Sequence, residues 1–140
     1  AFGNPKNQLL FKWSNHDYGI KNLKFSTCSQ MLFSYGFDKQ VIIWNLANKG
    51  GIVSSQTVSF DISDSLWIAN KNHGDSNAKI ITCGNDNIHI FQLNPFKGTL
   101  TSKPFNLKKI KRNFVKLFEL QKSPFILSGS FSGDLLLLDL

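Results

Sequence analysis

The chain has 140 residues, of which 41% are hydrophobic and 13% aromatic, enough to bury the core of one ordinary domain. It contains no run of 18 apolar residues, so the sequence predicts no membrane-spanning helix. The net charge of +7 favours an anionic partner, but Arg112 is the only Arg, and scarcity of Arg argues against a nucleic-acid site.

Short apolar runs rich in β-branched and aromatic residues alternate along the chain with turns that contain Gly, Asn and Asp. This pattern is typical of antiparallel strands joined by tight turns. In chain order the expected strands are 8–13, 20–26, 31–35, 41–46, 52–60, 65–70, 78–83, 88–93, 99–107, 113–120, 125–130 and 135–140. No segment carries a 3.6-residue apolar period over ten residues, so we expect an all-β protein.

Residues 31–46 give the strongest hairpin signal and set the period of the chain. Two apolar runs flank a turn in which Gly36 relaxes the backbone and the Asp38 carboxylate accepts hydrogen bonds from turn N–H groups. The pattern returns twice, with Trp44, Phe91 and Leu138 at equivalent places in steps of 47 residues. A constant step in this range, with four strands per step, predicts the blades of a β-propeller.

The repeat divides one propeller domain into units. Residues 1–15 are expected to hold the outer strand of a preceding blade, 16–62 and 63–108 two blades, and 109–140 an incomplete third blade. Stacked units need neighbours on both sides, the chain begins without Met, and it ends within an apolar run. We therefore expect a piece of a longer protein.

The first blade closely resembles a WD repeat. His16 precedes the first strand, Ser34 lies on the second, Asp38 in the next turn and Trp44 on the third. In the WD family, residues of these types at these places form a buried hydrogen-bonded tetrad. A buried indole N–H and imidazole need partners, which a hydroxyl and a carboxylate supply. The resemblance implies a WD-type propeller in which the tetrad is structural and His16 is not a ligand or a base.

The other two blades depart from the WD pattern, and we expect them to depend on apolar packing. Blade two keeps Thr82 and Asp86 but has Phe91 in place of Trp and no matching His. Asp38, Asp86 and Asp134 each lie in a turn of a separate blade, whereas acid–base catalysis needs groups that converge. We assign Asp86 and Asp134 to turn-capping and expect no enzyme activity.

A basic run follows the second blade and is the one local feature that suggests partner binding. It contains Lys108, Lys109, Lys111 and Arg112. These side chains could lie against an acidic protein surface, or they could be solvated loop charge. Both interpretations remain open at the level of sequence.

The cysteines and histidines show no metal-binding pattern. Cys28 and Cys83 stand alone, 55 positions apart, which offers no zinc spacing, and no two His residues have metal spacing. We expect two reduced, half-buried thiols in a cytoplasmic protein, with no metal and no cofactor.

A more specific resemblance extends over residues 17–140. A degenerate blade with Gly-Asn-Asp-Asn at 84–87 precedes the basic run, an apolar strand, and the terminal stretch 128–136. This order resembles a cilia- and flagella-associated WD-repeat family of axonemal doublet microtubules. It implies a structural, non-enzymatic protein of the axonemal cytoskeleton, seated on or inside doublet microtubules, that binds tubulin and other axonemal proteins and has no small-molecule substrate. The alternatives are a generic WD-repeat scaffold in trafficking, signalling or RNA processing, and a propeller enzyme or nucleic-acid binder.

Overall fold

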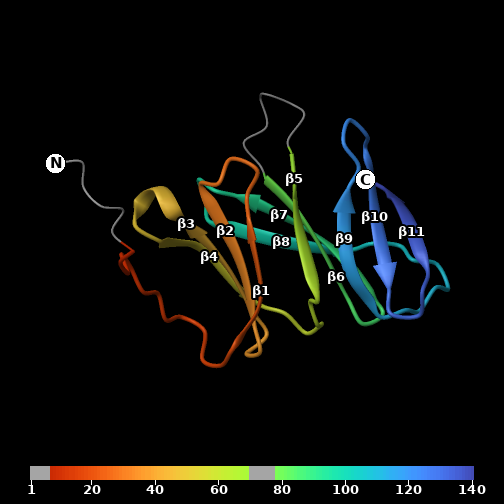
Figure 1. Cartoon of the computed structure of the whole chain (residues 1–140), viewed down its shortest axis with the longest axis horizontal. Helices are drawn as coiled ribbons and strands as arrows, with labels where there is room; N and C mark the ends of the chain where they lie inside the picture. The colour runs from red at the N-terminus through yellow and green to blue at the C-terminus, as the bar shows by residue number, and fades with distance from the viewer. Residues whose placement is uncertain (1–6, 70–77) are drawn as a thin grey trace.

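The described part of the chain forms three antiparallel sheets. The computed structural model describes residues 7–69 and 78–140, so residues 1–6 of the predicted unit 1–15 and residues 70–77 of the predicted blade 63–108 lie outside the described residues. Sheet one has the order β1 (Ile20–Phe25), β2 (Met31–Gly36), β3 (Gln40–Asn45), β4 (Gly51–Thr57), with a short 3-10 turn, η1 (Leu46–Asn48), after β3. Sheet two has the order β5 (Asp64–Ile68), β6 (Ala78–Gly84), β7 (Asn87–Asn94), β8 (Thr99–Pro104), and sheet three comprises β9 (Phe114–Glu119), β10 (Phe125–Ser130), β11 (Leu135–Asp139). Each sheet is a meander of consecutive strands (Figure 1).

The all-β prediction is confirmed, with one strand prediction wrong. Residues 8–13 form no strand, because their backbone exchanges no hydrogen bonds with another segment of the described chain. The outer strand predicted over 99–107 ends early, at Pro104, which has no N–H to donate to the ladder. The other predicted strands form with shifts at their ends.

Residues that are 47 positions apart in sequence occupy equivalent positions in the three sheets. Trp44, Phe91 and Leu138 lie on the third strand of their sheets, and each faces an apolar residue of the second strand. Their partners are Leu32, Ile80 and Ile126. The three residues are buried, so each sheet places one large apolar side chain at the same point.

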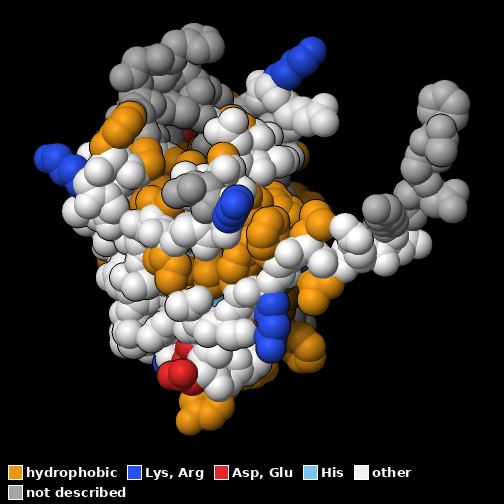
Figure 2. Space-filling model, turned by 90° about the vertical axis from the view of Figure 1, so that its left-hand side faces the viewer, with side chains coloured by type: hydrophobic (Ala, Val, Ile, Leu, Met, Phe, Trp, Pro, Cys, Tyr) orange, Lys and Arg blue, Asp and Glu red, His pale blue; other side chains and the backbone are white. Residues whose placement is uncertain are grey.

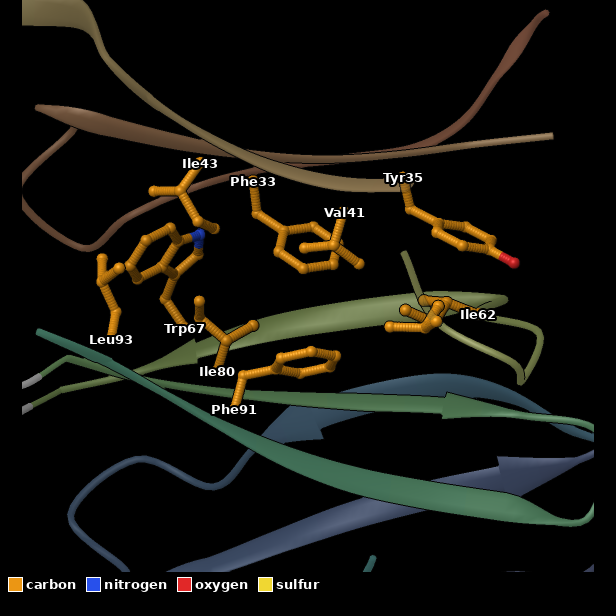
Figure 3. Close-up of a cluster of buried hydrophobic side chains, with 10 residues drawn as sticks. Phe33, Tyr35, Val41, Ile43, Ile62, Trp67, Ile80, Phe91 and Leu93 are labelled. Atoms are coloured by element: carbon orange, nitrogen blue, oxygen red, sulfur yellow. The ribbon is translucent and has the colours of Figure 1, made fainter. Parts of the chain in front are cut away.

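The first core fills the space between sheets one and two (Figure 3). Phe33 and Tyr35 alternate with Ser34 along β2, so both point toward sheet two. Phe33 meets Phe91 edge-on at 6.3 Å between ring centroids. The other buried members are Val41, Ile43, Val58, Ile62, Trp67, Ile80 and Leu93.

A second core lies between sheets two and three. Its buried members are Ile81, Cys83, Ile88, Phe114, Leu117, Ile126 and Leu138. Ile80 belongs to the first core and Ile81 to the second, since successive side chains of β6 point to opposite faces. Sheet two is therefore buried on both sides, which explains the continuous apolar run of β6.

The outward face of sheet three remains largely uncovered, whereas the outward face of sheet one is covered in part, since Ile42 and Trp44 there are 1% and 5% exposed. On sheet three, Leu127 pairs with both Phe118 and Leu137, and the side chains of Phe118 and Leu137 are more than half exposed. Figure 2 shows hydrophobic side chains gathered on the opposite side of the molecule, where sheet one faces away from sheet two. In a stack of repeats, such faces are buried only by a neighbouring unit.

The strands give the molecule two distinct ends. The turns 37–39, 85–86 and 131–134 join the second and third strands of the three sheets, and they lie at one end together with His16. This end is called the tetrad end below, and the opposite end the far end. The first strands, β1, β5 and β9, neighbour one another from sheet to sheet and form the inner edge of the stack.

Candidate functional site

The structure brings the four tetrad residues together at the tetrad end of sheet one. Trp44 Nε1 donates to Ser34 Oγ at 2.8 Å, and Ser34 Oγ lies 2.8 Å from His16 Nε2. His16 Nδ1 lies 3.1 and 3.2 Å from the two carboxylate oxygens of Asp38. A neutral His16 satisfies every group when the Ser34 hydroxyl donates to Nε2 and Nδ1–H donates to Asp38. The tetrad is thus a closed internal chain of hydrogen bonds.

Asp38 ties the tetrad to the backbone. Desolvation acts to raise the pKa of Asp38, but hydrogen bonds from the Gln40 N–H, the His16 ring and the Asp17 N–H outweigh it and hold this pKa below its ordinary value. Gly36 leaves the space that this arrangement needs, because a Cβ there would lie 2.5 Å from His16 Nδ1. The ionised carboxylate therefore fastens the turn to the segment that enters sheet one.

The segment before His16 covers part of the outward face of sheet one. Trp13 packs on Trp44 with 5.9 Å between ring centroids, and its Nε1 donates to the Lys49 carbonyl at 3.1 Å. Gly50 has φ of +78°, and a Cβ there would collide with the Trp13 ring. The indole shields the tetrad from the outward side.

Sheets two and three lack the tetrad and pack through apolar groups at the corresponding positions. Thr82 is fully buried, and its hydroxyl has no hydrogen-bond partner among the described residues. In sheet three, Ser128 Oγ donates to the Lys116 carbonyl at 3.2 Å. The large side chains at the Trp44 position, Phe91 and Leu138, have no N–H group to bind either hydroxyl.

The predicted turn-capping role is wrong for Asp86. Its side chain is exposed and bonds to no described residue, while its backbone occupies the left-handed region at φ of +55°. Asn87 closes this turn instead, because its Nδ2 donates to the carbonyls of Asn85 at 2.8 Å and Asp61 at 3.2 Å. An amide can donate to carbonyl oxygens and a carboxylate cannot.

Asp134 does lie within its turn, and it also binds a residue of the basic run. Its carboxylate accepts a hydrogen bond from the Ser130 hydroxyl at 3.4 Å and pairs with the Arg112 guanidinium. Arg112 is therefore paired within the molecule, although its side chain is still 43% exposed, and its predicted role in partner binding stays a prediction. Lys108, Lys109 and Lys111 are exposed, and none forms an ion pair with a described carboxylate.

Sequence reasoning missed Asp64, a buried carboxylate on the inner strand β5. Its Oδ1 accepts from the Ser65 N–H at 2.9 Å, and its Oδ2 accepts from the Leu117 N–H of β9 at 3.0 Å. Asn22 Nδ2 and Lys24 Nζ of β1 lie 3.5 and 3.6 Å from Oδ1. One carboxylate thus joins the inner strands of all three sheets. The available signal was an acidic residue directly before the strand predicted over 65–70.

The cysteines differ from the expected half-buried pair. Both are free, with Cys28 exposed in the β1–β2 turn and Cys83 fully buried. Burial raises the pKa of Cys83 to about 12, and a hydrogen bond from Ser26 lowers the pKa of Cys28. The described residues contain no group of three side chains suited to hold a metal ion.

Comparison with known proteins identifies the fold. No protein-family model and no curated protein matches the chain. A crystal structure of the mitotic checkpoint complex matches 93% of this chain with a TM-score of 0.70 at 17% identity, and the dihydro-heme d1 dehydrogenase NirN in complex with DHE matches 88% with a TM-score of 0.60 at 16% identity. The matches cover 39% and 26% of those chains.

Together with the three sheets, these matches show a WD-like β-propeller fold. The identities are low enough that the likeness concerns the fold alone. Neither match points to cilia. No helix in residues 7–69 and 78–140 is long and apolar enough to cross a membrane.

Proposed function

We propose that the chain is part of a non-enzymatic propeller scaffold that binds an acidic protein surface through the basic loop, defined as residues 105–113. The observation that carries the proposal is the exposure of Lys108, Lys109 and Lys111 on one loop of the tetrad end. Exposed like charges without internal partners are available to an anionic surface. A propeller presents such loops on a rigid frame.

The chemistry of the tetrad end favours a scaffold over an enzyme. His16, Ser34 and Asp38 use their polar atoms on one another and on backbone groups. Asp134 is paired with Arg112, and Asp86 stands alone in a separate turn. Catalysis by acids and bases needs groups that converge on one substrate with polar atoms still available to it, so these residues suit a structural role.

The more specific form of the proposal places the protein in the axoneme of a cilium or flagellum, bound to doublet microtubules. Three points support it: the sequence resemblance over residues 17–140, the net charge of +7, and the acidic character of tubulin surfaces. The lysine-bearing loop then lies against tubulin and contributes to the stability of the microtubule wall. The alternative is a generic WD-repeat scaffold that binds another acidic partner.

Microtubule co-sedimentation tests the proposal. The 140-residue chain is expected to pellet with microtubules, and the triple variant Lys108→Gln, Lys109→Gln, Lys111→Gln is expected to bind roughly tenfold more weakly. The matched control changes three exposed lysines of the far end, Lys79, Lys97 and Lys122, to Gln. Equal loss in both triple variants would reduce the effect to net charge and contradict a role for the basic loop.

Fractionation of purified cilia tests the location. We expect the native protein to remain with doublet microtubules after extraction by detergent and then by high salt. Release into the soluble matrix, or absence from cilia, would refute the axonemal form and leave the generic scaffold.

A further inference from the structure

A preformed pocket lies beside the basic loop at the tetrad end. Its volume is about 390 Å³, and it opens between the start of β7 and the loop that follows β8. Its lining combines residues of both segments, among them Asp86, Asn87 and His89 on one side and Lys108, Ile110 and Lys111 on the other. The pocket is open to solvent on one side and does not enclose a ligand, so it offers room for one or two side chains of a partner.

The pocket wall formed by the basic loop is fixed by backbone contacts. The Phe105 N–H donates to the Ile88 carbonyl at 2.7 Å, and the Asp86 N–H donates to the Arg112 carbonyl at 2.8 Å, so both ends of the loop are tied to sheet two. The Lys108 N–H donates to Asn106 Oδ1 at 2.9 Å. Phe105 and Leu107 pack against the second core. A ligand therefore meets a wall whose backbone is already ordered, which lowers the entropic cost of binding.

The polar part of the wall next to β7 is neutral and internally paired. Asn87 Nδ2 donates to two carbonyls, which leaves its Oδ1 to accept from His89 Nδ1 at 3.2 Å. The His89 ring stacks on Phe60 with 3.6 Å between centroids, and burial lowers the pKa of His89, so the ring is neutral at pH 7.

The charge of the pocket comes from three residues. Lys108 and Lys111 contribute two positive charges to the lining, and Asp86 contributes one negative charge. Ile88, Leu107 and Ile110 add apolar surface, and Ile110 is 44% exposed. The pocket thus combines lysine ammonium groups with an apolar wall, and Asp86 opposes any anion that enters.

We propose that this pocket binds a carboxylate side chain of an acidic peptide segment, with an adjacent apolar side chain of the same segment against Ile110. The inference rests on the proposed function, because it names the partner chemistry that the basic loop recognises. Lys108 and Lys111 are the recognition residues, and Lys109, which does not line the pocket, contributes only to the long-range field. Asp86 limits affinity and selects against weakly charged segments.

A fluorescein-labelled peptide of six glutamates around one central leucine is the probe, and its binding to the full-length protein is measured by fluorescence anisotropy. The double variant Lys108→Gln, Lys111→Gln is expected to raise the Kd about tenfold, and the control Lys97→Gln, Lys122→Gln about twofold or less. Asp86→Asn is expected to lower the Kd by about threefold, a gain that misfolding cannot imitate. Replacing the leucine of the probe by serine is expected to weaken binding.

Equal effects of the two double variants, or no gain in Asp86→Asn, would overturn the inference. The outcome is independent of the microtubule assay. If the peptide binds as predicted while microtubules do not, the axonemal proposal fails and the pocket remains. If microtubules bind through the three lysines while the peptide does not bind, the pocket inference fails and the scaffold proposal remains.

Discussion

Removal of the Asp64 carboxylate should destabilise the protein more than any surface change, because this group links three sheets. In Asp64→Ala, the buried N–H groups of Ser65 and Leu117 lose their acceptor. Hydrogen bonds to a charged acceptor contribute about 1.5–3 kcal/mol each, and water that enters the site recovers part of this. Lys24 is 38% exposed at its side chain, so its ion pair adds less than about 1 kcal/mol.

The expected loss in Asp64→Ala is therefore about 3–4 kcal/mol in the free energy of unfolding. Asp64→Asn keeps one oxygen acceptor and should lose about 1–2 kcal/mol. Urea unfolding followed by tryptophan fluorescence measures both, since Trp67 lies on the same strand and donates from Nε1 to the Lys24 carbonyl at 2.9 Å. If the carboxylate couples the sheets, the unfolding transition of Asp64→Ala should also be broader, with a smaller m value.

The control is Asp139→Asn, which changes an exposed carboxylate on β11 and should shift stability by less than about 0.5 kcal/mol. A double-mutant cycle of Asp64→Asn with Asn22→Ala measures the coupling across β1 and β5. A loss in Asp64→Ala as small as the control would refute the reasoning, because it would mean that Leu117 and Ser65 find other partners at no cost.

Three further outcomes are expected. Trp44→Ala should cost about 3–5 kcal/mol in urea unfolding, since the indole is 5% exposed, and a near-neutral result would contradict the blade register. Native protein should react with Ellman's reagent at Cys28 alone and release one equivalent of the reagent's thiolate per chain, and Cys83 should react only after denaturation. Rapid labelling of both cysteines in the native protein would contradict the burial of Cys83. Because the pKa of His89 is lowered in the folded state, the unfolded chain binds more protons than the folded chain as pH falls below about 6.5. The free energy of unfolding should therefore decline below that pH, and His89→Gln should make the decline smaller. Identical pH profiles of the two proteins would exclude His89 as the source of the decline.

The sequence determined the features that depend on neighbours along the chain. Short apolar runs rich in β-branched and aromatic residues predicted the strands, and turns such as 36–40 predicted the hairpins, because both signals lie in neighbouring residues of the chain. The 47-residue step located Trp44, Phe91 and Leu138 at matching points of the pairing register. The tetrad was also predicted, through the resemblance of the first blade to a WD repeat at His16, Ser34, Asp38 and Trp44.

Only the tertiary structure decided which distant groups meet. Asp64 binds Asn22 and Leu117, which are 42 and 53 residues away in sequence, and no local pattern encodes that convergence. The pairing of Arg112 with Asp134, 22 residues away in sequence, also follows from the fold and not from the basic run itself. Residues 8–13 have strand composition but no strand, because a β-strand exists only through the hydrogen bonds of a neighbouring chain segment.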